Sequence, residues 1–266
     1  MLLKQSSLAF VLGFLWFLPN DIRAQVSLAA GTNYAQNFNT LPSTSANTNG
    51  TVKWTNNVTL PGWYARAQVS GDYTSIRISA GESKNNGLYS FGGTATNSMS
   101  DRALGSIASK SPAVIAYGVR LKNDTTNALG KFTVSFTGEQ WRISTPNGAE
   151  QSLTFAYRTS AAPLTNPEPG VDSGWTPVPP LDFLRLNYKG GAAALDGNAA
   201  ANRTNFTNVP LADLVIKPGE ELFLRWQDID DADQNDHGLA IDDVTVNYSP
   251  VGGPAPADAE KTTVKP

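Results

Sequence analysis

Alternating hydrophobic and polar residues recur along the chain and predict β-strands. In segment 131–137, Phe132, Val134 and Phe136 fall on one face of an extended strand, while threonine and serine fall on the other. The same alternation predicts strands at 114–121, 152–158 and 222–226, and a weaker form predicts strands at 75–79, 88–91, 209–216 and 239–248. No segment after residue 24 carries a sustained 3.6-residue apolar stripe, so we expect strands joined by loops.

Pairs of turn-forming residues separate the predicted strands and indicate the fold class. Pro-Gly or Asn-Gly pairs stand at 61–62, 86–87, 147–148, 169–170 and 218–219. This pattern predicts an all-β fold, an antiparallel two-sheet β-sandwich of jelly-roll, concanavalin-like or galactose-binding-like form. Residues 25–250 are expected to form this single domain, with long surface loops at 159–180 and 188–208 and a disordered tail at 251–266.

The first 24 residues have the pattern of a signal peptide. Lys4 precedes an uncharged apolar run of 11 residues, from Leu8 to Leu18, and Ala24 places a small residue at the expected cleavage point. A helix that spans a bilayer needs about 20 apolar residues, and no later segment approaches that length. We therefore expect a secreted, periplasmic or extracellular protein with no membrane span in the mature chain.

The composition argues against several kinds of chemistry. The 266 residues include no cysteine and a single histidine, His237, which argues against disulfide scaffolds, Cys-ligated metals and multi-histidine metal centres. Removal of residues 1–24 takes away Lys4, Arg23 and Asp21 and leaves 18 basic and 22 acidic residues. This acidic balance argues against nucleic-acid binding, which depends on clustered Lys and Arg.

Seven aspartates lie in the segment 228–243 and form the main chemical cluster in the sequence. The run 231–235 has the spacing D-x-D-x-N, which turns alternate oxygen ligands toward one hard cation, and Asp242 stands at the twelfth place of that loop. Its sixth place is Asp236 where an EF-hand carries glycine, so an EF-hand itself is not expected. One interpretation is a solvated acidic turn. The other is a calcium site whose ligands are Asp228, Asp231, Asp233, Asn235 and Asp242.

Strand register places Asp242 at the edge of the core. If Val244 and Val246 point inward, Asp242 shares their face, and a carboxylate in that position needs a partner. The partner is expected to be a cation or one of the arginines Arg225, Arg120 and Arg102. His237 is expected to donate a hydrogen bond at the neighbouring turn.

Four aromatic residues in turn-rich segments are candidates for sugar binding. They are Trp54, Trp63, Tyr64 and Trp175. An exposed aromatic ring can stack on the face of a sugar, but large aromatics also dominate the cores of sandwiches, so both interpretations stay open.

Two segments near the C-terminus carry a family resemblance. Residues 221–230 read ELFLRWQDID, and residues 236–246 read DHGLAIDDVTV. Together they resemble the closing strands of a group of secreted bacterial β-sandwich domains that end in DHGLAIDDV. YGVRL at 117–121 and GEQWR at 138–142 agree with this resemblance, which covers nearly the whole mature chain. It implies an exported β-sandwich, and the IDDV ending is also similar to that of adhesin-type and carbohydrate-binding jelly rolls.

These patterns favour a secreted, non-catalytic binding or surface module that binds a polysaccharide or cell-surface glycan, with calcium stabilising one loop. A jelly-roll glycoside hydrolase or polysaccharide lyase is the catalytic alternative. A hydrolase needs two carboxylates across a cleft, and the acids available outside the aspartate-rich segment include Glu139, Glu150, Asp182 and Glu221. A structural cell-surface or matrix protein is the third interpretation.

Overall fold

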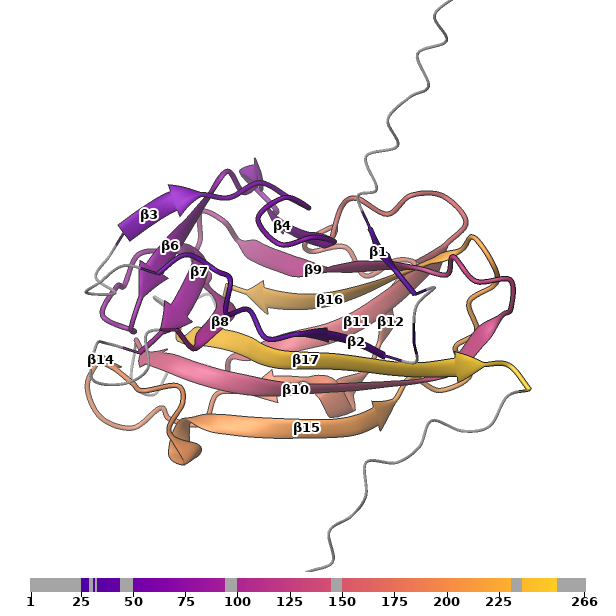
Figure 1. Cartoon of the computed structure of the whole chain (residues 1–266). Helices are drawn as coiled ribbons and strands as arrows, with labels where there is room; N and C mark the ends of the chain where they lie inside the picture. The colour runs from indigo at the N-terminus through magenta and orange to yellow at the C-terminus, as the bar shows by residue number, and fades with distance from the viewer. Residues whose placement is uncertain are drawn as a thin grey trace, which may run out of the picture.

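Two β-sheets stacked face to face organise the chain (Figure 1). The computed structural model describes residues 25–28, 31, 33–43, 50–93, 100–144, 150–230 and 236–252. The predicted signal peptide and nearly all of the predicted tail lie outside these residues. No helix within the described ranges is long and apolar enough to cross a membrane.

The first sheet, called sheet I here, has eight strands, six of which form the order β12-β11-β16-β9-β4-β5. The short strand β1 pairs with β9 in parallel, and β13 pairs with β11. The strands of sheet I are β1 (Val26–Ser27), β4 (Trp63–Ala67), β5 (Gly71–Asp72), β9 (Val114–Lys122), β11 (Ser152–Ser160), β12 (Thr176–Pro177), β13 (Phe183–Leu184) and β16 (Glu221–Ile229).

The second sheet, sheet II, has nine strands, seven of which form the order β14-β10-β17-β8-β7-β6-β3. β15 pairs with β10 and β2 pairs with β17, and the pair β6 and β7 is parallel. The strands of sheet II are β2 (Asn33–Gln36), β3 (Gly50–Lys53), β6 (Ser75–Ser79), β7 (Gly87–Gly92), β8 (Arg102–Ile107), β10 (Leu129–Ile143), β14 (Ala193–Ala194), β15 (Arg203–Pro210) and β17 (Gly238–Pro250). Two 3-10 helices, η1 (Pro179–Leu181) and η2 (Ala200–Asn202), lie in the connections.

The inward faces of both sheets supply one main hydrophobic core. Phe132, Val134 and Phe136 of β10 are buried against residues of β9 and β16, as their alternation predicts. Trp226 lies at the centre of this core, where its ring meets those of Trp63, Phe136 and Phe155. The structure confirms the predicted all-β, antiparallel two-sheet sandwich, because almost every strand pairing is antiparallel and the two sheets share this core.

The long connection predicted at 188–208 differs from a plain loop. Its last residues begin β15, an edge strand beside β10. This strand ends at Pro210, so most of the strand predicted at 209–216 is not formed. Phe206 and Val209 pack on the core and hold β15 in place. Polar residues occupy most other positions of β15, and that composition hid the strand from the hydrophobic pattern.

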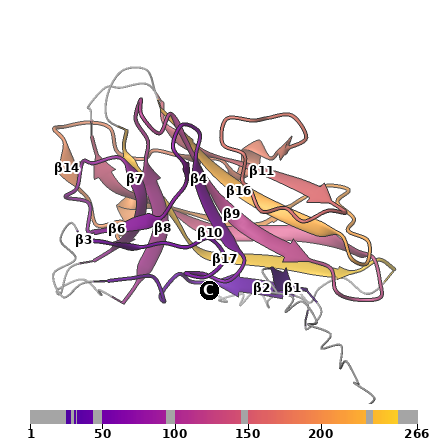
Figure 2. The same cartoon turned by 90° about the horizontal axis from the view of Figure 1, so that it is seen from above.

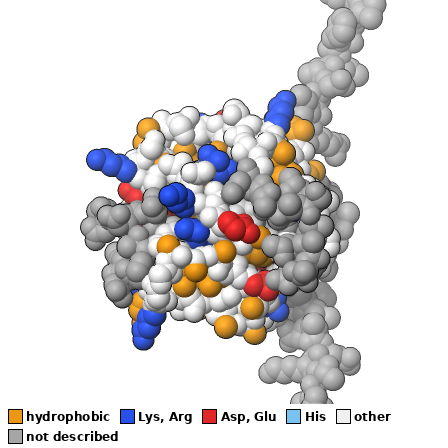
Figure 3. All heavy atoms as spheres, turned by 90° about the vertical axis from the view of Figure 1, so that its left-hand side faces the viewer, with side chains coloured by type: hydrophobic (Ala, Val, Ile, Leu, Met, Phe, Trp, Pro, Cys, Tyr) orange, Lys and Arg blue, Asp and Glu red, His pale blue; other side chains and the backbone are white. Residues whose placement is uncertain are grey.

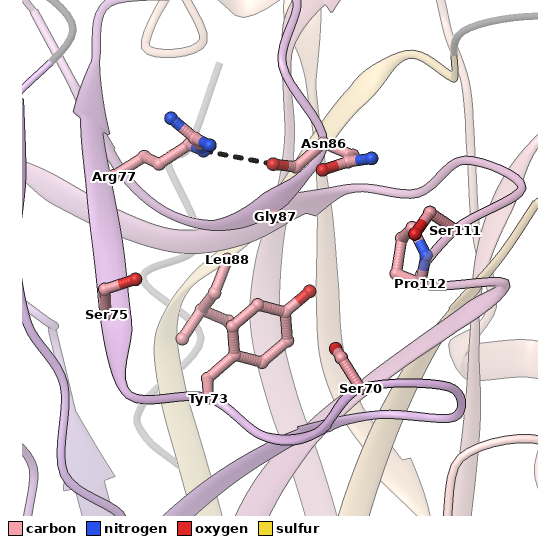
Figure 4. Close-up of a pocket in the computed structure, with 9 residues that line it drawn as sticks. All are labelled: Ser70, Tyr73, Ser75, Arg77, Asn86, Gly87, Leu88, Ser111 and Pro112. Atoms are coloured by element: carbon pink, nitrogen blue, oxygen red, sulfur yellow. Dashed lines mark hydrogen bonds between the residues drawn. The ribbon is translucent and has the colours of Figure 1, made fainter.

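One end of the sandwich is formed by β3, β6, β7 and β8, which lie side by side in sheet II. Figure 2 shows this group at one end of the molecule, while β9, β16 and β11 of sheet I run along its length. The turn between β4 and β5 and the segment that leads into β9 approach the same end (Figure 4).

Candidate functional site

The four aromatic residues predicted to bind sugar are all buried. Trp54 and Trp63 are 1% and 0% exposed, and the Trp63 indole donates a hydrogen bond to the Tyr34 hydroxyl at 2.8 Å. Tyr64 and Trp175 pack with Phe223 on the outer face of sheet I, under the connection that follows β11. The exposure that a stacking platform needs is therefore absent, because each ring fills space inside the protein.

Arg225 accounts for the burial of Trp175. The guanidinium carbon of Arg225 lies 4.0 Å from the centre of the indole ring, in the geometry of a cation–π contact. Its Nη1 donates to the backbone carbonyls of Glu168 and Val171, at 3.0 and 2.8 Å. Arg225 thus fixes the connection that follows β11 on the outer face of sheet I. The turn-rich segment around Trp175 is part of this covering connection, and the indole ring beneath it is not exposed.

Asp228 belongs to the interior of the sandwich. It follows Trp226 on the inward face of β16, and its carboxylate accepts a hydrogen bond from the Ser106 hydroxyl of β8 at 2.6 Å. Because β8 lies in sheet II, this contact joins the two sheets. The Asp228 charge also raises the pKa of Tyr117, after the larger effect of burial.

Asp242 lies on the outer face of sheet II, away from the core. The prediction that it shares the inward face of Val244 and Val246 is therefore wrong. Leu239 and Ile241 face the core, and so do Val244 and Val246, so the alternation shifts by one residue between the two pairs. The ladder between β10 and β17 has an irregularity here, and Asp243 has a positive φ of 51°. This β-bulge turns Asp242 to the outer face.

The predicted arginine partners of Asp242 are engaged elsewhere. Arg120 pairs with Glu221, Arg102 donates to the Ser90 hydroxyl, and Arg225 holds the connection over sheet I. Arg203 acts on the two acids beside Asp242, because its charge lowers the pKa of Glu139 and of Asp243.

The predicted calcium ligands do not converge in the described part of the chain. Asp228 faces the space between the sheets, whereas Asp242 faces outward from sheet II, so one ion cannot contact both. Asp231, Asp233 and Asn235 lie outside the described residues. Within the described ranges, no group of three or more histidine, aspartate or glutamate residues is placed to hold a metal ion.

Asp242 and Glu139 form a pair of carboxyl groups with strongly raised pKa values. Burial, followed by the neighbouring charges, raises the pKa of Asp242 to about 9 and that of Glu139 to about 8. The Trp141 indole donates a hydrogen bond to Glu139 at 3.0 Å. Both groups therefore hold protons at neutral pH, and His237 is buried away from them, with its Nδ1 accepting a hydrogen bond from the backbone of Ser144.

A polar hollow of about 170 Å³ opens at the end of the sandwich (Figure 4). Ser75 and Arg77 of β6 form one wall, and Asn86, Gly87 and Leu88 form another where β7 begins. Tyr73 extends into the space from the segment between β5 and β6, and its hydroxyl points toward the middle (Figure 4). Hydroxyl groups of Ser70 and Ser111 complete the lining, together with Pro112.

A second hollow of about 300 Å³ adjoins the first. It is lined by Lys84, Asn85 and Ser109, and it shares Arg77 and Asn86 with its neighbour. We call the two hollows together the end groove. A pocket for a drug-sized ligand has a volume of about 300–1,000 Å³, so each hollow has room for a small group. Two adjoining hollows of this size suit consecutive units of a longer chain.

Arg77 is positioned by the backbone of the groove. Its Nε donates to the carbonyl of Asn86 at 3.0 Å, and the Asn86 amide donates to the Ser109 hydroxyl at 2.6 Å. A Cβ at Gly87, which has a φ of 139°, would lie 3.2 Å from Arg77 Nε, so glycine makes room for the side chain. Within the described residues, Nη1 and Nη2 of Arg77 form no hydrogen bond or ion pair.

Tyr73 keeps its proton at neutral pH. Burial raises its pKa well above the usual value, and the charge of Asp228 raises it further, while Arg77 lowers it. A protonated phenol can donate and accept hydrogen bonds but is a poor base.

The sequence contained the parts of this groove but did not identify them as a site. The strand at 75–79 and the Asn-Gly turn at 86–87 were both predicted, and serine and arginine alternate on one face of that strand. Tyr73 and Arg77 belong to no spaced motif, and the topology alone brings them beside Ser111. A polar face on a strand next to a turn is the available signal.

Comparisons with known proteins give distant similarity in structure alone. No family model matches the sequence, and no curated protein matches it. A tailspike protein of bacteriophage CBA120 is 9% identical, with a TM-score of 0.33, and the match covers 71% of this chain and 19% of the tailspike. An adhesin domain of Lys-gingipain from Porphyromonas gingivalis is 10% identical, with a TM-score of 0.34 and coverage of 74% and 98%.

A carbohydrate-binding module specific for non-crystalline cellulose is 12% identical, with a TM-score of 0.33 and coverage of 71% of this chain and 87% of the module. Likenesses at this level carry no argument about function. The resemblance to secreted domains ending in DHGLAIDDV stays a prediction.

Proposed function

We propose that the protein is an exported, non-catalytic module that binds a polysaccharide in the end groove. The observation that carries the proposal is the lining of the first hollow, where serine hydroxyls, the Asn86 amide and the Arg77 guanidinium share one space with the ring of Tyr73. Export rests on the signal-peptide pattern of residues 1–24.

The lining suits a sugar in two ways. Ser70, Ser75 and Ser111 can donate or accept hydrogen bonds, which sugar hydroxyls need in both directions. The ring of Tyr73 supplies an apolar surface beside them, against which the C–H face of a sugar ring can pack. The adjoining second hollow gives the next unit of a chain a place to lie.

The groove does not favour a catalytic function. Among the described residues that line the two hollows there is no aspartate or glutamate, whereas glycoside hydrolysis uses a pair of them. The raised pKa of Tyr73 disfavours proton abstraction from a sugar by this phenol, as a lyase would require. Binding by hydrogen bonds and packing needs neither group.

Calorimetric titration with a panel of neutral and charged polysaccharides tests the proposal. Tyr73→Ala should weaken binding about tenfold or more, because it removes a hydrogen-bonding group and a packing surface together. Tyr73→Phe keeps the ring and should weaken binding less, which guards against a loss caused by misfolding of the alanine variant.

Tyr188→Ala is the matched control. Tyr188 is 39% exposed and lies beside Arg185 and Lys189, so it is an accessible tyrosine among cations outside the groove. Its replacement should leave the affinity unchanged. Failure of the whole panel to bind, or an equal loss in the Tyr188 and Tyr73 variants, would contradict the proposed function.

A further inference from the structure

We propose that the sugar units recognised by the end groove are anionic, carrying a carboxylate or a sulfate ester. This inference rests on the proposed function and specifies its ligand class. It follows from the cations at the groove, from the available Nη1 and Nη2 groups of Arg77 and from the absence of acids in the described lining.

Two cations line the groove, and two more stand next to lining residues. Arg77 and Lys84 line it, Lys110 stands between the lining residues Ser109 and Ser111, and Lys53 is the cross-strand partner of Ser75. None of the four forms an ion pair with a carboxylate of the described residues. Figure 3 shows several Lys and Arg side chains on this end of the molecule, with Asp and Glu side chains among them.

The lining cations stand on a chain whose overall net charge is −3. Glu82 is the acid on the connection between β6 and β7, and its carboxylate accepts hydrogen bonds from the Ser79 hydroxyl and the Ala80 backbone. Asp228 acts on Tyr73 from within the core and is 2% exposed. Neither acid lines the groove, so the described lining holds cations and no carboxylate.

Arg77 has the geometry for an oxyanion. The bond from Nε to the Asn86 carbonyl fixes the side chain, and Nη1 and Nη2 stay available as a fork. A planar guanidinium can donate two parallel hydrogen bonds to a carboxylate or sulfate group. The hydroxyls of Tyr73 and Ser75 belong to the same hollow and can meet the sugar hydroxyls.

Lys84 has a different role from Arg77. It is exposed, it lines the second hollow, and its ammonium group acts as a point charge without fixed geometry. We expect Lys84 to attract the charge of the neighbouring sugar unit. Such an attraction between exposed charges weakens as salt is added.

Matched pairs of polymers test the inference by calorimetric titration of the full mature chain. Polygalacturonate is compared with its fully methyl-esterified form, and dextran sulfate is compared with dextran. We expect at least one charged polymer to bind about tenfold more tightly than its neutral twin, since a charge-assisted hydrogen bond contributes about that factor. The tighter of the two charged polymers identifies carboxylate or sulfate as the preferred group.

Charge-removing variants locate the effect. Arg77→Gln should weaken binding of the charged polymer about tenfold and weaken binding of its neutral twin much less, because only the charged polymer loses a charge-assisted hydrogen bond. Lys84→Gln should weaken it less and reduce its dependence on salt, and this exposed position keeps the test usable if Arg77→Gln fails to fold. Lys217→Gln is the control, because Lys217 is exposed and precedes the start of β16, whereas the groove lies near the end of that strand.

The possible failures are distinct. Equal binding of charged and neutral twins, with Arg77→Gln without effect, overturns the anionic ligand and leaves the proposed function standing. An equal loss in Lys217→Gln and Arg77→Gln shows general attraction to a polyanion and overturns the assignment to the groove. Absence of binding to every polymer contradicts the proposed function itself.

Discussion

Asp228 is a structural residue that joins the two sheets from within the core. Its carboxylate accepts the Ser106 hydroxyl hydrogen bond across the sandwich, and a hydrogen bond to a buried charged group contributes more than a neutral one. The hydrophobic pattern predicts a strand that ends at 226 and leaves Asp228 in the aspartate-rich segment, whereas β16 continues to Ile229. The sequence could not reveal Ser106 as the partner, because the two residues are 122 positions apart.

Ser106→Ala should lower the free energy of unfolding by about 1–3 kcal/mol, because the variant removes one donor to a buried carboxylate. Denaturant unfolding measures this change, and a double-mutant cycle with Asp228→Asn should give a coupling of about 0.5–3 kcal/mol. Ser135→Ala, at a half-buried hydroxyl on the outer face of sheet II, should change stability by less than about 0.5 kcal/mol. Additive effects of the Ser106 and Asp228 variants would show that the contact is not formed.

At the scale of elements, alternation was a good guide to strands and a poor guide to their irregularities. The faces of β9, β10 and β16 agree with the pattern, because the alternate apolar side chains of each strand are buried in the main core. The bulge at Asp243 turns Asp242 from the predicted inward face to the outer face of sheet II, and the spacing of the aspartates does not predict a bulge. The burial of the four candidate aromatics likewise could not be predicted from alternation, because it depends on how loops pack on the sheets.

The bulge has a consequence for pH dependence, since it brings Asp242 near Glu139. Both carboxyl groups have raised pKa values in the folded protein, about 9 and about 8, so the folded state holds protons that the unfolded state releases above pH of about 4. The stability that they contribute is fully present below the unfolded pKa and is lost as pH rises through the folded values. Each such proton changes the free energy of unfolding by about 1.4 kcal/mol per pH unit in that range.

Asp242→Asn should therefore raise the melting temperature at pH 8 and flatten the fall in stability between pH 5 and pH 9. The asparagine oxygen can still accept the hydrogen bond from the backbone of Asp243. Thermal unfolding followed by circular dichroism across this range measures the effect. Asp213→Asn, at an exposed aspartate, should leave the curve as in the wild type. A wild-type protein that is more stable at pH 9 than at pH 5 would contradict the assignment.

At the scale of the whole molecule, the fold concentrates apolar groups in the middle and leaves an open polar site at one end. Trp54, Trp63 and Trp226 fill the interior, so aromatic content contributes to stability instead of to an exposed platform. The groove arises where β6 and β7 of sheet II meet the segments that lead into β5 and β9 of sheet I. Composition and alternation predicted the sandwich, but only the meeting of segments between residues 70 and 112 defines the site.

Nuclear magnetic resonance mapping of backbone amides, with a stepwise titration of a galacturonate oligosaccharide, tests the binding of an acidic sugar in the end groove most directly. The predicted result is a saturable set of shift changes confined to residues 70–77, 84–88 and 109–112, with Trp63 and Trp175 unaffected. Shift changes centred on the outer strands β10 and β15, or no changes in the three segments at saturating ligand, would contradict the account.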